Sequence, residues 1–351
     1  MMQKQLENIF RGKKILVTGG TGCIGSEIVR SVLKYKPEVV RIFSNDEDNT
    51  FRMMHEIDAS GTKMMYEIVD KRFLIGDIRD KERVMLAMED IDIVYHAAAL
   101  KHVPLCEYNP FEAIKTNVLG TRNVIEAAFA SGVDRVISIS TDKAVNPVNT
   151  MGATKLLAEK LIIDANEGKG VKPTIFSSVR FGNVSFSRGS VIPLFEEQIR
   201  QKIPITITNP DMTRFMMSLS DTVELVFKAT LLAKGGELFI LKMPVVRLGD
   251  LIDVIIETYA EKYHYKKESI KKNNIGLRPG EKIYEELMTE SEAAVAFEID
   301  DMLIIPPQLE VTSINYNVSD YPNARPSKLS RYLSRDIKPI SKEEIKRLLF
   351  S

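Results

Sequence analysis

Short apolar runs alternate with helical segments along the first half of the chain, and this alternation restricts the fold more than any other feature. The apolar runs, which we expect to be strands, cover residues 14–18, 39–43, 72–75, 92–96, 135–139 and 174–179. Helical segments are expected at about 26–36, 46–57, 80–88, 110–132 and 150–166. This order predicts an α/β protein with a doubly wound parallel sheet. Ligands of such sheets bind at the carboxyl ends of the strands.

The alternation fades after Gly182, where prolines interrupt the chain. We therefore expect a sheet-containing domain at 1–182, a smaller substrate-binding lobe at 183–305 that is partly interleaved with the core, and a tail at 306–351. The tail is loop-like and ends in a short helix, for which Ser341 and Glu344 form a capping-box signature. Its loop character makes it a candidate for covering the site or a neighbouring subunit.

The charge balance argues against partners that need a basic protein. The chain has 48 Lys and Arg residues and 48 Asp and Glu residues, so binding to nucleic acid or an anionic membrane surface is not expected. Residues 1–14 are polar, and no apolar stretch is long enough for a membrane segment, so a cytoplasmic protein is predicted. Cys23 and Cys106 are expected to be reduced. The spacing of the histidines predicts no metal site: His55, His96, His102 and His264.

Three glycines lie between the first predicted strand and the helix after it. Gly19, Gly22 and Gly25 have the spacing and the strand–helix context of a dinucleotide-binding loop. Small residues let the backbone approach a pyrophosphate, and the helix N-terminus offers it unpaired N–H groups. The loop therefore predicts a Rossmann-type domain that binds a nicotinamide dinucleotide through Gly19, Thr21, Gly22, Cys23, Ile24 and Gly25.

Further cofactor contacts are expected where the following strands end. Asp46 lies 21 residues after Gly25, near the spacing at which a carboxylate binds the adenosine ribose, and this favours NAD over NADP. Two alternatives stay open: Asp46 caps a helix, and Arg41 or Arg52 binds a 2′-phosphate. The other contacts expected from strand ends are Ser44, Asp77, Ile78, Ala97, Ala98, Ala99 and Ser140.

The fifth predicted strand ends in Ser140-Thr141-Asp142-Lys143, and the next predicted helix carries Met151 and Lys155 on one face. Together with the loop Thr18 to Gly25, this arrangement resembles the extended short-chain dehydrogenase/reductase superfamily, which carries Tyr-x-x-x-Lys on that helix. The resemblance implies that Lys155 holds the nicotinamide ribose. Met151 takes the place of the tyrosine, and a thioether has no titratable proton, so Met151 is not a general base.

Within that superfamily the chain is similar over residues 12–290 to the nucleotide-sugar 4,6-dehydratases that act on UDP-N-acetylglucosamine in bacterial polysaccharide and glycan biosynthesis. The matching stretches are 97–104, 115–117, 140–144, 151–155, 180–184, 187–193, 211–215 and 278–282. The resemblance adds Lys101 and Asn117 to the expected cofactor contacts. It also implies a homo-oligomer, a dimer or a hexamer.

The activity implied is that of a hydro-lyase that makes a UDP-4-keto-6-deoxy sugar, with retention at C5 and with tightly bound NAD or NADP recycled in each turnover. Lys143 is the expected base for the C5 proton, which requires its pKa to be depressed by burial and by Lys101 or Lys155. Asp142 is the expected acid for the C6 hydroxyl and a relay for the proton of the 4-hydroxyl. Thr141 is expected to orient that 4-hydroxyl.

Arginines are expected to bind the diphosphate of the substrate, because a planar guanidinium suits phosphate; each of the three candidates also has a structural interpretation. The expected substrate contacts are Lys101, His102, Thr141, Lys143, Asn183, Arg188, Ser190, Val191, Thr206, Thr208, Arg214, Met243, Arg278 and Glu281.

Two alternatives to this activity stay open. The first is another enzyme on a UDP-sugar, either an inverting dehydratase or a C5- or C4-epimerase, although Met151 disfavours a simple C4-epimerase. The second is a non-catalytic regulator that binds NAD. Such a regulator does not need Asp142 and Lys143 together with several candidate phosphate-binding arginines.

Overall fold

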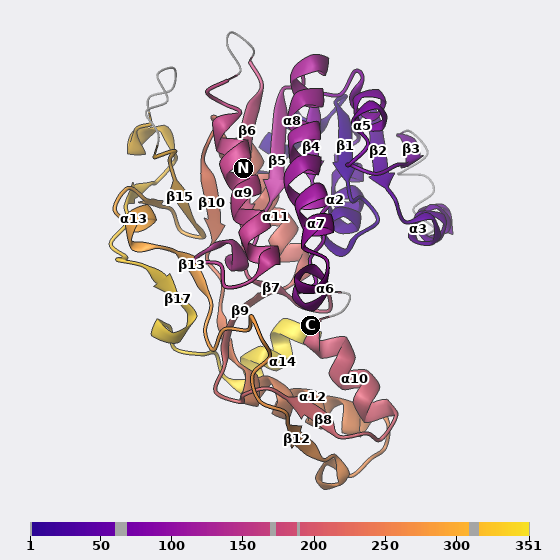
Figure 1. Ribbon diagram of the computed structural model, residues 1–351, viewed down its shortest axis with the longest axis vertical. Coiled ribbons are helices and arrows are strands. Elements are labelled where there is room, and N and C mark those ends of the chain that lie inside the picture. The colour runs from indigo at the N-terminus through magenta and orange to yellow at the C-terminus, as the bar shows by residue number, and fades with distance from the viewer. Residues whose placement is uncertain (1, 60–68, 169–172, 188–189, 309–315, 351) are drawn as a thin grey trace.

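A ten-stranded sheet forms the centre of the main part of the molecule, and helices cover its faces (Figure 1). The computed structural model describes residues 2–59, 69–168, 173–187, 190–308 and 316–350. In this part of the chain seven parallel strands lie in the spatial order β3 (Asp70–Ile75), β2 (Val39–Ser44), β1 (Lys14–Thr18), β4 (Ile93–His96), β5 (Arg135–Ile139), β6 (Ile175–Arg180) and β10 (Leu238–Leu241). The strands β1 to β6 match the predicted strands to within two residues at each end, so the doubly wound sheet is confirmed.

The sheet continues past β10 with strands from the last quarter of the chain. β15 (Met302–Ile305) pairs antiparallel with β10, and β14 (Phe297–Glu298) and β16 (Arg325–Pro326) follow it toward the edge. One side of the sheet is therefore built from segments that are far from the first six strands in sequence.

Alternate residues of the parallel strands face two apolar layers. Ile15 and Val17 of β1 face the layer formed by α1 (Met2–Phe10), α2 (Cys23–Leu33), α3 (Glu47–Ala59) and α11 (Leu219–Leu232). Leu16 faces the opposite layer, formed by α5 (Lys81–Met88), α8 (Gly120–Ser131) and α9 (Thr150–Asp164). Because both faces are covered, the central strands have buried residues on both faces, as in β1, β4 and β5, instead of a strict alternation of buried and exposed positions.

Some helix boundaries differ from the sequence prediction. α1 was not predicted, since residues 1–14 are mostly polar; it buries only Leu6 and Phe10, one helical turn apart. α2 begins at Cys23 instead of about residue 26, because Gly22 already occupies its N-cap. The helical stretch predicted at 110–132 is confirmed, but a π-helical turn (Ile114–Leu119) separates α7 (Pro110–Ala113) from α8.

A second group of elements lies beyond the carboxyl ends of the strands (Figure 1). It contains α10 (Val191–Arg200), α12 (Leu248–Lys262), α14 (Lys342–Phe350), β8 (Ile205–Ile207) and β12 (Lys272–Asn274). The helices share an apolar cluster of their own, with Phe195, Ile252 and Leu349 among its members. Between this group and the main sheet lie β7 (Asn183–Val184) and β9 (Thr213–Met217) (Figure 1). They form a small sheet with β11 (Val245–Arg247), which pairs with β9.

The tail is more regular than predicted. β17 (Tyr332–Leu333) pairs with β13 (Glu286–Met288), which leads into α13 (Glu290–Ala293). The capping box before α14 is confirmed, because Ser341 N–H donates to Glu344 at 2.8 Å and Glu344 N–H donates to Ser341 Oγ at 3.3 Å. The short helices outside these elements are α6 (Val103–Tyr108), η2 (Asp142–Ala144), η3 (Lys267–Ser269), η4 (Val318–Asp320) and η5 (Ser334–Asp336).

Candidate active site

A cleft of about 1000 Å³ opens at the carboxyl ends of the parallel strands. One wall comes from the loops after β1 to β5, and the other comes from α10, β8 and β9. Its volume is at the upper end for small-molecule sites, which suits a dinucleotide and a second ligand together. In the described residues of the tail, 306–308 and 316–350, none lines this cleft, so the structure does not support the expectation that the tail covers it.

The glycine loop forms one end of the cleft. Gly19 has a φ of +64°, and a Cβ there would lie 2.7 Å from the backbone nitrogen of Ala98. A Cβ on Gly25 would lie 2.2 Å from the carbonyl oxygen of Gly19. Both positions therefore require glycine, and the close approach points the N-terminus of α2 into the cleft. All the predicted loop contacts line it: Gly19, Thr21, Gly22, Cys23, Ile24 and Gly25.

The ends of β2 and β3 lie beside this loop. Ser44, Asp46, Asp77 and Ile78 all line the cleft, and Ser44 Oγ lies 2.7 Å from Thr21 Oγ1. Asp46 also caps α3, since its carboxylate accepts the N–H of Asn49 at 2.9 Å. The alternative that Asp46 is a helix cap is therefore correct, and it is compatible with a ribose contact because the side chain still faces the cleft.

Arg41 does not bind a phosphate. Its guanidinium is buried and donates to the carbonyl oxygens of Ala87 at 2.9 Å and Glu89 at 2.6 Å. Arg52 is exposed on α3 and is not among the described residues that line the cleft. Neither arginine that was considered for a 2′-phosphate is placed to bind one.

The loop after β4 lies at the middle of the cleft, where Ala97, Ala98, Ala99, Lys101 and His102 line it. Burial, together with the charge of Lys101, lowers the pKa of His102. Asn117, which was predicted to contact the cofactor, does not line the cleft.

Asn117 is buried in the π-helical turn. Its side-chain oxygen accepts the N–H of Leu100 at 2.8 Å, and its Nδ2 donates to the Leu100 carbonyl and to Thr154 Oγ1. Because these bonds use both N–H groups of its amide, Asn117 fixes the loop after β4 to α9, and it does not line the cleft.

The end of β5 brings Thr141, Asp142 and Lys143 together at the centre of the molecule. Ser140, Thr141 and Lys143 line the cleft, whereas Asp142 is fully buried behind them. Asp142 Oδ1 accepts from Thr141 Oγ1 at 2.8 Å and from Lys143 Nζ at 3.0 Å. The prediction that Asp142 donates directly to the C6 hydroxyl is therefore wrong in this geometry, since Asp142 reaches the cleft only through Thr141 and Lys143.

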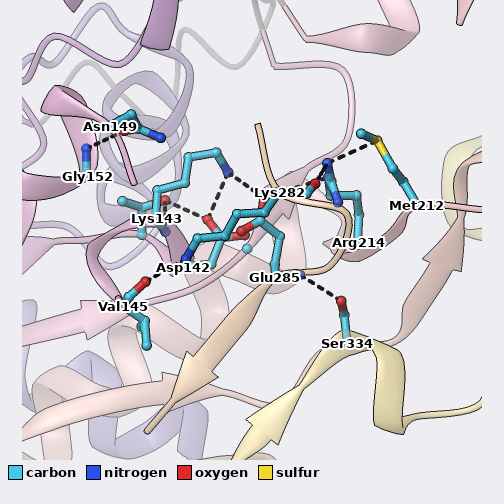
Figure 2. Close-up of polar contacts among 12 residues, drawn as sticks. Asp142, Lys143, Val145, Asn149, Gly152, Met212, Arg214, Lys282, Glu285 and Ser334 are labelled. Carbon is cyan, nitrogen blue, oxygen red and sulfur yellow. Dashed lines mark hydrogen bonds and ion pairs between the residues drawn. The ribbon is translucent and has the colours of Figure 1, made fainter. Parts of the chain in front are cut away.

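Lys143 lies between two buried carboxylates (Figure 2). Its Nζ is 3.0 Å from Asp142 Oδ1 and 3.7 Å from Glu285 Oε1. Burial acts to lower the pKa of Lys143, but the two carboxylates outweigh it and the pKa is raised. The predicted depression of this pKa by burial and by Lys101 or Lys155 is therefore wrong, because the sequence did not reveal Glu285.

Met151 and Lys155 line the cleft from α9, one turn apart. Met151 packs with Cys106 and Ala113 in a small apolar cluster. Nζ of Lys155 donates to the Ile139 carbonyl at 2.6 Å, and burial lowers the pKa of Lys155 to about 8. Met151 and Lys155 therefore line the same part of the cleft, the first as a side chain without a titratable proton and the second as a cation.

The opposite wall carries most of the predicted substrate contacts. Those that line the cleft are Asn183, Ser190, Val191, Thr206, Thr208, Arg214, Arg278 and Glu281. Arg188 lies outside the described residues. Met243 is wrong as a contact: its sulfur accepts the N–H of Gly182 at 3.0 Å, and the residue is buried away from the cleft.

The N-terminus of α10 points into the cleft at Ser190 and Val191. Oγ of Ser190 is buried and has no hydrogen-bond partner in the described part of the chain, and it does not cap its own helix. A helix N-terminus with an unused hydroxyl favours an anion. Arg214 is less available, because its guanidinium already donates to the carbonyl oxygens of Thr213 and Lys282.

Two kinds of site residue were missed from the sequence. Apolar side chains line the lobe wall at Leu194, Phe195, Met212, Met216, Val246, Leu248 and Leu251. Their pattern is that of ordinary core residues, so nothing in the sequence distinguishes them. Glu285 was also missed, although its position directly after the matched stretch 278–282 was an available signal.

Comparisons with known proteins agree with this architecture. A Methanocaldococcus jannaschii protein named as an uncharacterized membrane protein is 53% identical, over 99% of this chain and 98% of its own. A UDP-N-acetylglucosamine 4,6-dehydratase (inverting) from Campylobacter jejuni is 42% identical, over 86% of this chain and 85% of its own. A UDP-glucose 4-epimerase from Rickettsia rickettsii is 39% identical, over 98% of this chain and 97% of its own. Among the described helices, none combines the length and the apolar character needed to cross a bilayer.

The solved structure of Pen from Bacillus thuringiensis is 49% identical and superposes with a TM-score of 0.88 over 97% of both chains. Residues 15–307 match the family model described as polysaccharide biosynthesis protein. On this match and these identities, the chain belongs to the polysaccharide biosynthesis protein family.

Proposed function

We propose that the protein is a hydro-lyase that converts UDP-N-acetylglucosamine into a UDP-4-keto-6-deoxy-N-acetylhexosamine for surface polysaccharide or glycan biosynthesis. The observation that carries the proposal is the cluster at the end of β5, where Thr141 and Lys143 face the cleft in front of buried Asp142. The non-titratable Met151 stands where reductases and epimerases of the resembled superfamily carry tyrosine. The name of the Campylobacter relative supports the same reaction and substrate.

The residues of the glycine loop fit a nicotinamide dinucleotide. The tight contacts of Gly19 and Gly25 leave room for a pyrophosphate at the N-terminus of α2, and Asp46 faces the same end of the cleft. Asp46 favours NAD over NADP. Arg41 favours NAD as well, because its guanidinium donates to backbone carbonyls and is not placed to bind a 2′-phosphate. When bound, the dinucleotide supplies the acceptor and donor of the hydride, and Lys155 holds its nicotinamide ribose.

The side chains at the end of β5 move the protons. Thr141 orients the 4-hydroxyl and passes its proton toward Asp142, to which it is hydrogen bonded at 2.8 Å. Lys143 removes the C5 proton, which the 4-ketone makes acidic, and it donates a proton to the departing C6 oxygen. The protons balance, because two are released, from the 4-hydroxyl and from C5, while one leaves in water and one returns to C5.

We propose retention at C5, because Lys143 returns a proton to the same face of the sugar ring from which it removed one. Met151 has no proton to donate to the other face. The competing outcome is inversion at C5, favoured by the name of the Campylobacter relative. A C4-epimerase is the third candidate, favoured by the name of the Rickettsia relative. The non-catalytic regulator has no observation of its own to favour it.

One experiment separates these candidates. The purified protein is incubated with UDP-N-acetylglucosamine in D₂O without added cofactor, and the products are followed by NMR. We expect a 4-keto-6-deoxy product that carries deuterium at C5 in the original configuration. The inverted C5 epimer would identify an inverting dehydratase, UDP-N-acetylgalactosamine would identify a C4-epimerase, and unchanged substrate would contradict the proposed function. A Lys143→Ala variant that turned over normally would remove Lys143 from the mechanism.

A further inference from the structure

Glu285 is a buried acid that the proposed mechanism leaves unused. The residue is 3% exposed, and its backbone N–H donates to Ser334 Oγ at 2.9 Å, which fixes the chain just before β13. Its Oε1 forms ion pairs at 3.7 Å with Lys143 Nζ and with Arg214 Nε. Its Oε2 has no hydrogen-bond partner in the described part of the chain. A buried carboxylate with an unused oxygen is costly, so its presence needs an explanation.

Glu285 lines a second cavity, of about 220 Å³, and does not line the cleft. The second cavity adjoins the cleft, since five residues line both: Lys143, Asn183, Arg214, Arg278 and Glu281. Figure 2 shows the Lys143 side chain extended between Asp142 and the segment that carries Glu285 and Lys282. The ammonium group is therefore placed to exchange a proton with the sugar on one side and with Glu285 on the other.

The charges around this pair come from three segments. Asp142 belongs to η2, Arg214 to β9, and Lys282 to the loop before β13. Burial raises the pKa of Glu285; Lys143 opposes this, Asp142 adds to it, and Arg214 and Lys282 oppose it, with a net rise. Two carboxylates thus share the ammonium of Lys143, and Oδ2 of Asp142 also lacks a hydrogen-bond partner in the described chain. Lys143 and Glu285 therefore titrate together rather than singly.

We propose that Glu285 is the proton-sharing partner of Lys143: when the sugar fills the cleft, one proton moves from Nζ of Lys143 to the carboxylate of Glu285. An N–H bond breaks and an O–H bond forms, and the net charge of the pair is zero before and after. The product is a neutral amine that faces the sugar and a neutral acid that lines the second cavity. Because a bound sugar displaces water, it disfavours the charged pair relative to the neutral one.

This inference rests on the proposed function, since it explains how a lysine with a raised pKa acts as the C5 base. Glu285 acts through Lys143 and touches neither substrate nor cofactor, so it is a positioning residue. It holds the proton that Lys143 needs again when C5 is reprotonated. A change in the pH dependence of kcat is the expected signature, because the proton stays within the pair instead of leaving to solvent.

The test compares the pH profile of kcat in the wild type and in Glu285→Gln, measured as formation of the 4-keto sugar between about pH 6 and about pH 9. In the wild type we expect a flat profile, because proton transfer within the pair does not depend on pH. In Glu285→Gln we expect kcat to rise about tenfold per pH unit, since the Lys143 proton must now leave to solvent, with KM little changed. A wild type with the steep profile, or a Glu285→Gln enzyme with the flat one, would overturn the inference.

Glu286→Gln is the matched control. Glu286 is adjacent in sequence, but its carboxylate accepts from Asn146 Nδ2 at 2.7 Å and lines neither cavity. This variant should keep the flat profile of the wild type. A steep profile here would mean that any loss of charge near β13 has the same effect, and the pairing of Glu285 with Lys143 would then be wrong.

A second measurement keeps the inference testable without turnover. If the wild type forms no 4-keto sugar, the proposed function fails, and the pair is then examined by ¹³C NMR titration of the glutamate carboxyl groups in the wild type and in Lys143→Met. We expect one glutamate signal with a raised pKa to titrate at still higher pH in Lys143→Met, because the cation opposes its protonation. If no glutamate signal responds to Lys143→Met, the inference is wrong. The same titration serves if Glu285→Gln does not fold.

Discussion

At the scale of single residues, burial decides the charge of His96. This side chain ends β4 and is 2% exposed, with Nδ1 at 2.8 Å from Thr18 Oγ1 and Nε2 at 3.0 Å from Thr121 Oγ1. Burial, aided by the charge of Lys155, lowers the pKa of His96 to about 3. The imidazole therefore stays neutral in the folded protein at pH values where it is protonated in the unfolded chain.

This difference makes the stability depend on pH. The unfolded chain binds a proton at His96 below about pH 6.5, and the folded protein does not, so this contribution is fully present above pH 6.5 and is lost as the pH falls toward 3. Between pH 6.5 and pH 5 we expect the free energy of unfolding to fall by about 2 kcal/mol from this group. Urea denaturation at a series of pH values measures it.

His96→Asn should show a correspondingly smaller fall in stability over the same pH range. The matched control is His264→Asn, at an exposed position with a φ of +56°, which asparagine tolerates. The control should keep the wild-type pH dependence. Equal pH dependence in His96→Asn and the wild type would contradict the assignment to His96.

The roles of single residues were predicted from the sequence only in part. Spacing and resemblance located Thr141, Lys143 and Lys155 in the cleft, because all three are local to the end of β5 and the next helix. The burial of Asp142 and the raised pKa of Lys143 were not predicted. Both depend on tertiary packing: Asp142 and then Glu285 raise the pKa of Lys143, and Glu285 comes from a distant segment that leaves no local pattern near residue 143.

At the scale of elements, the contact between the glycine loop and α2 sets the geometry of the cofactor end. In Gly25→Ala the new Cβ would lie 2.2 Å from the Gly19 carbonyl oxygen, so α2 must move away from the loop. We expect the affinity for NAD to fall by about tenfold or more, because the N–H groups at the helix N-terminus no longer point at the pyrophosphate. Isothermal titration calorimetry with NAD measures the loss, on protein from which bound cofactor has first been removed.

Gly132→Ala provides the control for Gly25→Ala. Gly132 ends α8 with a φ of +68°, and a Cβ there meets no atom within 4 Å. This variant should lose about 1 kcal/mol of stability from the strained backbone but keep the wild-type affinity for NAD. If both variants bound NAD equally well, the tight contact at Gly25 would not be what positions the helix.

Elements with a strong apolar period were predicted well, and their ends were not. β1 to β6 follow the sequence closely, because each contains a short apolar run that the polar segments on either side do not share. α1 escaped prediction since two buried residues, Leu6 and Phe10, are too few to show a period among polar neighbours. The short strands of the lobe, such as β7 and β11, are set by pairing with β9 rather than by their own two or three residues.

At the scale of the whole molecule, Arg180 joins parts of the chain that are distant in sequence. It ends β6, is 1% exposed, and forms ion pairs with Glu159 of α9 at 2.7 Å and with Glu292 of α13 at 3.0 Å. Burial acts to lower the pKa of Arg180, but the two carboxylates raise it. The guanidinium also donates to the Leu287 carbonyl at 2.8 Å, next to the segment that carries Glu285.

Arg180→Ala should therefore destabilise the protein strongly, because it leaves the buried carboxylate of Glu159 and the half-buried carboxylate of Glu292 without their cation. We expect a loss of about 3–5 kcal/mol in the free energy of unfolding, measured by chemical denaturation. Arg247→Ala is the control, since it removes an exposed surface pair with Asp250 and should leave the stability nearly unchanged. A loss at Arg180 as small as that at Arg247 would show that the buried cluster does not hold these parts together.

The insertion of β10 beside β6 has a consequence for synthesis on the ribosome. Domains fold from the N-terminus as the chain emerges, so β1 to β6 can pair before the later strands exist. Until Leu238–Leu241 emerges, Ile175–Arg180 is an edge strand with unpaired backbone groups, and such an edge is a template for pairing with another chain. Until β10 emerges, each nascent chain therefore carries an unpaired strand edge beside the future active site.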